Sequence, residues 1–167
     1  MRIILVRQAA VPGGTVRFRA AARGLARAIG RIDVLLTSPL PGAPESARIV
    51  ARALGRDAVV EPTLGGERVE ALIDALAIHP REATVALVAD EPILAALLGQ
   101  VLGICAGLCT LKRGSAALLD LPDGPSVAGR LEWLLPSRIL RALTHPTRVV
   151  RPSPTENGQA VVRKPKP

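Results

Sequence analysis

The order of apolar and amphipathic segments predicts an α/β fold with three layers, in which helices cover both faces of a mostly parallel central sheet. Short apolar runs rich in β-branched residues alternate along the chain with segments whose apolar residues recur at helical spacing. The chain has 167 residues, which is enough for one self-sufficient core. Aromatic residues are limited to Phe18 and Trp133, so this core must be aliphatic.

The N-terminal part is predicted to begin with a strand at residues 2–6, which are apolar and largely β-branched after Arg2. A helix follows at 15–29, where apolar residues fall on one face. A second strand is predicted at 33–37 and a short amphipathic helix at 45–54. A brief strand is predicted at 58–60, and we expect it to lie at the edge of the sheet.

The C-terminal part continues the alternation. An amphipathic helix is predicted at 67–78 and a buried strand at 84–89, followed by a helix at 93–102 that ends near Gly103. Functional groups in such a fold gather at the carboxyl ends of the strands. The closing elements are two strands and a helix, at residues 115–121, 130–134 and 136–143.

The first helix has two distinct faces. We expect Ala21, Leu25, Ala28 and Ile29 to face the core. Arg19, Arg23 and Arg27 follow one another at a spacing of four residues and form a basic stripe on another face. This stripe is either a solvated surface or a docking surface for an acidic partner.

The basic charge continues beyond the predicted domain. The formal net charge is +8, which favours anionic partners. Residues 144–167 hold five basic residues against Glu156 and are rich in proline, so we expect an extended or mobile tail. Few aromatic residues are present for base stacking and no nucleic-acid-reading motif occurs, so no specific nucleic-acid binding is expected.

Residues 92–111 carry no charge, and their glycines recur at a spacing that also occurs in membrane helix contacts. Pro92 and the glycines make a poor span, so the prediction is a buried helix and no membrane span. Cys105 and Cys109 give neither a disulfide framework nor a metal site, and we expect both to be buried. With no signal peptide, the expected location is the cytoplasm.

Three motifs occur at matching places in this order of elements. They are LVRQ at residues 5–8, TSPLPG at 37–42 and VADEP at 88–92. Each resembles a motif of the histidine phosphatase superfamily, and the nearest branch is the small bacterial phosphohistidine phosphatases. Residues 112–121 and 130–140 are similar to the closing elements of that branch. The resemblance implies a phosphoglycerate mutase-like fold over one domain, residues 1–143.

The resemblance also implies a site in which most of the reactive groups are replaced. Arg7 matches the first phosphate-binding arginine of the family. Gln8 stands in place of the histidine nucleophile, Gly42 in place of the second arginine, and Asp90 in place of the second histidine. An amide is not a nucleophile, and loss of a covalent nucleophile costs on the order of 10⁶ in turnover. Ordinary family catalysis is therefore not expected.

Several interpretations of the neighbouring residues stay open. Asp90 can pair with Arg7 and neutralise the old phosphate pocket, which we favour, or act with Glu91 as a nucleophile or metal ligand. Ser38 is expected to be a turn residue rather than a nucleophile. Arg17 and Arg19 are further candidates for the rim of the pocket. No metal and no cofactor are expected.

These residues favour a catalytically inactive protein with a binding or regulatory role. Its expected partner is a phosphorylated or acidic protein, or a small phosphorylated ligand. The alternative is a phosphatase, acting on phosphohistidine or a small phosphoester, with residual or altered activity through Arg7. Binding of nucleic acid or an acidic membrane through the basic tail is a third and less supported possibility. The sequence leaves the oligomeric state open.

Overall fold

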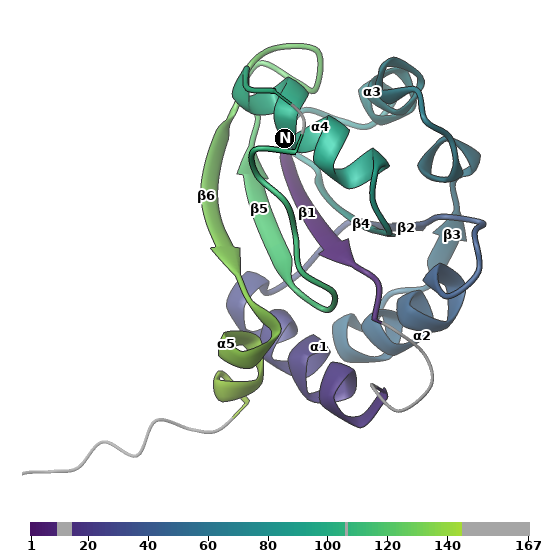
Figure 1. Cartoon of the computed structure of the whole chain (residues 1–167), viewed down its shortest axis with the longest axis vertical. Helices are drawn as coiled ribbons and strands as arrows, with labels where there is room; N and C mark the ends of the chain where they lie inside the picture. Colours follow the sequence, from purple (N-terminus) through teal and green to yellow (C-terminus); the bar gives the residue numbers. More distant parts are fainter. Residues whose placement is uncertain (10–14, 106, 145–167) are drawn as a thin grey trace, which may run out of the picture.

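The computed structural model describes residues 1–9, 15–105 and 107–144. At its centre is a six-stranded sheet with the order β3-β2-β4-β1-β5-β6 (Figure 1). All pairings among the first four strands in this order are parallel, and β5 runs antiparallel to both of its neighbours. The strands are β1 (Arg2–Arg7), β2 (Val34–Thr37), β3 (Ala58–Val60), β4 (Thr84–Ala89), β5 (Ala116–Asp120) and β6 (Arg130–Leu135).

Helices cover both faces of this sheet, so the predicted three-layer α/β fold is confirmed (Figure 1). The helices α1 (Thr15–Ile29), α2 (Ala43–Leu54) and α5 (Ser137–Ala142) pack on one face. The other face is covered by α3 (Val69–Ala77), α4 (Ile93–Leu102) and the 3₁₀ turn η1 (Pro62–Gly65). Each face buries its own cluster of aliphatic side chains. Because strand side chains alternate, Ile3 and Leu5 serve one cluster, while Ile4 and Val6 serve the other.

Several predicted helices differ from the observed ones in detail, and α3 begins at Val69, two residues later than predicted. The second helix begins at Ala43, two residues earlier than predicted, because Pro44 fits the first turn, where no backbone donor is required. In α1 the buried residues include Phe18 and Ala22, whereas Ala28 is exposed, contrary to the prediction. The stripe that starts from Phe18 continues through Leu25 and Ile29 and leaves Ala28 on the solvent side.

The prediction that both cysteines are buried was wrong. Cys105 is exposed and Cys109 is partly exposed. Cys105 is exposed because α4 ends near Gly103, as predicted, and this glycine, in a left-handed conformation, turns the chain just before Cys105. Cys109 is only partly buried, and it packs against an apolar cluster. Among the described residues no helix is long and apolar enough to cross a membrane. The predicted tail, residues 144–167, lies outside the described part of the chain apart from Thr144.

The parallel strands bring three motif segments to one edge of the sheet. Arg7 is in register with Ala89 across β1 and β4, and Thr37 is in register with Val88 across β2 and β4. Gln8, Ser38 and Asp90 therefore follow strands that end side by side. Since β5 runs the opposite way, the loop that precedes it also reaches this edge.

Candidate functional site

An ion pair between Arg7 and Asp90 lies at the centre of this edge. The Nε of Arg7 donates to Oδ1 of Asp90 at 2.7 Å. The side chains are 20% and 24% exposed, so the pair is partly shielded from water. The sequence favoured this pair, and the structure contains it.

Arg7 is held by further contacts within the protein. One terminal nitrogen donates to the carbonyl oxygen of Leu111 at 2.6 Å. The same nitrogen lies 3.4 Å from Oε1 of Glu91. The backbone N–H of Leu111 donates to that Glu91 oxygen at 3.0 Å, which ties the loop to the ion pair. Carboxylates of this chain thus balance the charge of Arg7, and its hydrogen bonds hold the side chain in one orientation.

Gln8 completes the set of donors around Asp90. Its Nε2 donates to Oδ2 of Asp90 at 3.0 Å and lies 3.5 Å from the carbonyl oxygen of Pro41. The side chain is only 9% exposed. Its Oε1 is buried without a hydrogen-bond partner among the described residues. The amide therefore serves Asp90 as a donor, although its other end is left unsatisfied, which typically costs about 1–3 kcal/mol.

Gly42 lies directly against Gln8. Its φ of +89° is in the left-handed region, which favours glycine. A Cβ added there would come within 3.4 Å of both the Nε2 and the Oε1 of Gln8. An arginine at this position would strain the backbone because of the positive φ, and its side chain would start in contact with the Gln8 amide. The conformation of the loop is thus matched to the absence of a second arginine here.

Arg113 is a member of the cluster that sequence reasoning missed. Its guanidinium group lies 3.9 Å from Oδ2 of Asp90, and its side chain is 55% exposed. It comes from the loop before β5, whose backbone is held to β1 through the hydrogen bond from the N–H of Gly114 to the carbonyl oxygen of Arg7. The antiparallel course of β5 brings this loop to the site, and no motif in the sequence indicated that.

The surroundings of Asp90 favour its ionised form. Burial raises the pKa of Asp90, but the hydrogen bond from Arg7, the backbone N–H of Glu91, the charge of Arg7 and the hydrogen bond from Gln8 together outweigh it. The pKa therefore lies below its ordinary value of 3.8, and Asp90 is an anion at neutral pH. The carboxylate accepts hydrogen bonds from Arg7, Gln8 and the backbone N–H of Glu91.

Other candidate residues lie outside this cluster. Ser38 is 1% exposed, and its Oγ accepts a hydrogen bond from the backbone N–H of Leu40, as expected of a turn residue. Arg17 and Arg19 are exposed on α1, and neither makes a hydrogen bond or ion pair with the cluster within the described ranges. Arg19 instead lines a groove between α1 and α2.

The chemical capacity of the cluster follows from its members. It holds two guanidinium groups, two carboxylates and one amide, which bind anions or cations by charge and hydrogen bonding. Within the described residues, this cluster contains no histidine and no cysteine. No group of three or more His, Cys, Asp or Glu side chains in the described ranges is arranged to hold a metal ion.

Solved structures share this arrangement of strands and helices. The protein histidine phosphatase SixA, complexed with tungstate, aligns with a TM-score of 0.72 and 19% identity, over 84% of this chain and 99% of that one. The alpha-ribazole phosphatase from Shigella flexneri aligns with a TM-score of 0.65 and 14% identity, over 82% and 97% of the two chains. A phosphoglycerate mutase from Plasmodium falciparum has a TM-score of 0.63 and 18% identity, over 79% and 88%. In sequence, no family model and no curated protein matches this chain.

The chain therefore has the phosphoglycerate mutase-like fold of the histidine phosphatases, as its motifs predicted. Among these three structures, SixA aligns with the highest TM-score, and this chain spans almost all of it.

Proposed function

We propose that this chain is a non-catalytic protein of the histidine-phosphatase fold, which acts by binding and not by phosphoryl transfer. The observation that carries the proposal is that Asp90, an anion, accepts hydrogen bonds from both Arg7 and Gln8. By resemblance to the family, Arg7 matches the phosphate-binding arginine, and Gln8 stands at the position of the nucleophile. We infer that the chain's own carboxylate takes the hydrogen bonds that a phosphoryl group would receive at these two positions.

Two physical arguments support the loss of catalysis. The Gln8 amide cannot form a phosphorylated intermediate, because its nitrogen is neither basic nor nucleophilic. A phosphate about 4 Å from Asp90 would also meet a repulsion of roughly 4 kcal/mol per unit charge at an effective dielectric constant of 20. Both effects oppose turnover at the step where the family would bind and attack phosphorus.

The alternative is a phosphatase with residual or altered activity. The position of Arg113 favours it, because this second guanidinium group lies near Oδ2 of Asp90, whereas Arg7 donates to Oδ1. If Asp90 moved aside, Arg7 and Arg113 together could bind an oxyanion. This alternative requires an external nucleophile such as water.

Phosphate release distinguishes the two proposals. The substrates are a phosphohistidine peptide and a generic aryl phosphate, and wild type is compared with Arg7→Ala and with Arg2→Ala as a matched control. Arg2 is exposed at the other end of β1. The proposal predicts that wild type and both variants release phosphate at the same background rate. Turnover that Arg7→Ala abolishes and Arg2→Ala preserves would establish the residual enzyme instead.

A further inference from the structure

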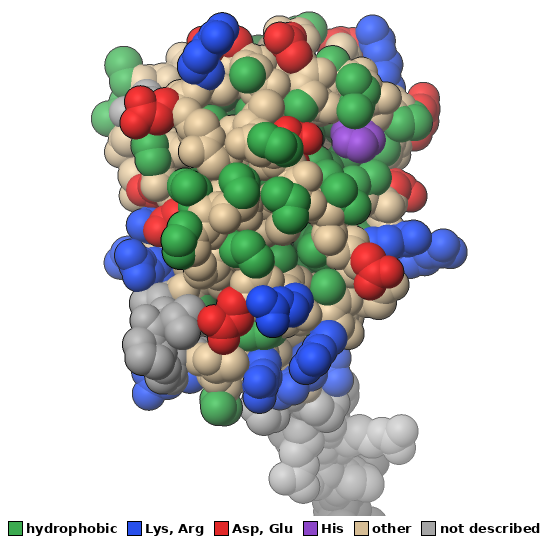
Figure 2. Space-filling model, turned by 90° about the vertical axis from the view of Figure 1, so that its right-hand side faces the viewer, with side chains coloured by type: hydrophobic (Ala, Val, Ile, Leu, Met, Phe, Trp, Pro, Cys, Tyr) green, Lys and Arg blue, Asp and Glu red, His purple; other side chains and the backbone are tan. Residues whose placement is uncertain are grey.

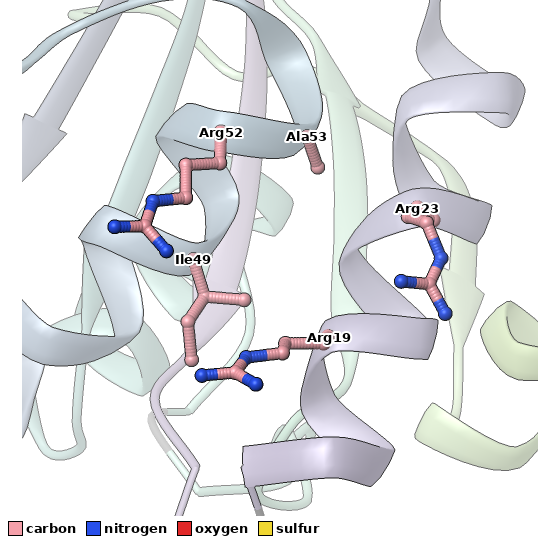
Figure 3. A pocket seen from close by; sticks show the side chains of 5 residues that line it. All are labelled: Arg19, Arg23, Ile49, Arg52 and Ala53. Atoms are coloured by element: carbon pink, nitrogen blue, oxygen red, sulfur yellow. The ribbon is translucent and has the colours of Figure 1, made fainter.

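Helices α1 and α2 form a groove whose sides carry arginines. Arg19 and Arg23 come from α1 and Arg52 from α2, while the partly buried Ile49 and Ala53 supply apolar surface between them. Figure 3 shows Arg19 extending from α1 toward Ile49 on α2. The groove encloses about 370 Å³, which is within the range of ligand pockets in proteins.

The basic surface continues into a smaller hollow beside this groove. It encloses about 180 Å³ and adds Arg48 and Glu45 from α2 and Thr15 from α1. We call the two together the arginine groove. Its four arginines, at positions 19, 23, 48 and 52, outnumber the single carboxylate of Glu45.

The positive charge of this groove is not neutralised within the described chain. All four arginines are exposed, and none forms an ion pair with a described carboxylate. The structure describes every acidic residue except Glu156. On each helix the two arginines are four residues apart and repel one another. An anionic occupant would relieve this repulsion.

We propose that the arginine groove binds an acidic, amphipathic segment of a partner protein. The four guanidinium groups match carboxylates, and the apolar surface of Ile49 and Ala53 matches an aliphatic side chain. Nucleic acid fits less well, because no aromatic side chain lines the groove to stack on a base. A flat lipid surface would not reach the apolar residues between the helices. The chain's own residues 145–167 are unsuited, since they are basic overall.

This surface is distinct from the cluster around Arg7 and Asp90. None of its lining residues belongs to that cluster, and it lies on the helices that cover one face of the sheet. The proposal therefore goes beyond the proposed function and does not depend on whether the Arg7 cluster releases phosphate.

Fluorescence anisotropy with a labelled peptide tests it. The probe is a peptide as long as α2, which has 12 residues, with glutamates and leucines at helical spacing. Wild type is compared with the double variant Arg19→Glu and Arg52→Glu. The matched control, Arg68→Glu with Arg81→Glu, makes the same change in net charge at exposed positions outside the groove. Circular dichroism verifies that both double variants are folded.

We expect wild type to bind this peptide and the groove variant to bind it at least about tenfold more weakly, since two attractions become repulsions. The control variant should stay within about twofold of wild type, apart from weak long-range effects that salt screens. A peptide with glutamine for glutamate, or serine for leucine, should also bind more weakly.

Three results would overturn the proposal. The first is no binding of the acidic peptide to wild type at low ionic strength. The second is equal loss in the groove and control variants, which would indicate net charge or the tail rather than the groove. The third is groove-dependent binding of a single-stranded oligonucleotide or of phosphatidylserine vesicles in place of the peptide.

Discussion

Asp90, which directly follows β4, accepts hydrogen bonds from three donors. Arg7 donates from β1, Gln8 from the residue after β1, and the backbone N–H of Glu91 from the residue that follows Asp90. A carboxylate with this many donors is stabilised as an anion. Its stabilising effect on the folded chain must therefore depend on pH.

The sign of this dependence follows from the lowered pKa. Burial opposes ionisation of Asp90, but its hydrogen bonds and the charge of Arg7 outweigh burial, so the folded pKa lies below 3.8. The contribution of Asp90 to stability is then fully present above pH about 4 and is lost as the pH falls through the folded pKa. We predict that the free energy of unfolding of wild type exceeds that of Asp90→Asn at neutral pH and that this difference shrinks on acidification.

Urea denaturation of wild type and Asp90→Asn, from neutral pH to below the folded pKa of Asp90, measures the difference in their free energies of unfolding. At neutral pH we expect about 1–2 kcal/mol, between the values for exposed and buried ion pairs. A difference that stays constant, or grows as the pH falls, would contradict the account of Asp90.

At the scale of single residues, the sequence predicted part of the site. The pair of Arg7 and Asp90 could be expected, because both residues stand at the ends of apolar strands in matching motifs. The contacts of Arg7 with the carbonyl of Leu111 and of Asp90 with Arg113 could not. They depend on the path of the loop that precedes β5, and its glycines and polar residues show no periodicity that fixes a path.

At the scale of elements, α1 packs closely against α5 at Gly24. A Cβ at Gly24 of α1 would lie 1.7 Å from the carbonyl oxygen of Leu140 in α5. The two helices can meet at this distance only because position 24 lacks a side chain. Leu140 and Trp133 share the apolar cluster on this face.

We predict that Gly24→Ala displaces α5 and destabilises the fold by about 3 kcal/mol or more, as expected when a core contact is overpacked against rigid backbone. The measurement is thermal unfolding together with the fluorescence of Trp133, the chain's single tryptophan. Ala28→Ser, at an exposed position of the same helix, is the control and should change the stability little. Unchanged stability and fluorescence in Gly24→Ala would show that α5 does not rest on Gly24.

Element boundaries were predictable where a strong local signal exists. Gly55 and Gly103 adopt left-handed conformations at the ends of α2 and α4, and the helix end near Gly103 was predicted from that glycine. The 3₁₀ turn η1 was not predicted, because four residues show no helical period. The exposure of Cys105 was missed because it depends on where the chain goes after Gly103.

At the scale of the whole molecule, the fold and the chemistry are separable. The two apolar clusters that hold the sheet between its helices do not contain Arg7, Gln8 or Asp90. Replacing reactive groups at the sheet edge therefore leaves the core intact. The arrangement of strands and helices can therefore match that of SixA although only 19% of the aligned residues are identical.

The surface of the molecule also shows where positive charge is not balanced by the described carboxylates. In Figure 2, the Lys and Arg side chains on the visible face gather mainly toward one end of the molecule. Arg7 is neutralised by carboxylates of this chain, whereas the arginine groove is not, within the described residues. An anionic partner therefore meets arginines without a described carboxylate partner on the helices, whereas Arg7 at the sheet edge is already paired.

Titration with tungstate by isothermal calorimetry tests most directly whether Asp90 fills the pocket. The proteins are wild type, Asp90→Ala, Arg7→Ala, and Asp90→Ala combined with Arg7→Ala, so that binding to other arginines cancels in the comparison. We predict that Asp90→Ala gains a binding event, at least about tenfold tighter than any in wild type, and that adding Arg7→Ala removes it. If wild type already binds tungstate as tightly as Asp90→Ala, and Arg7→Ala alone abolishes that binding, the pocket is open and the central claim is wrong.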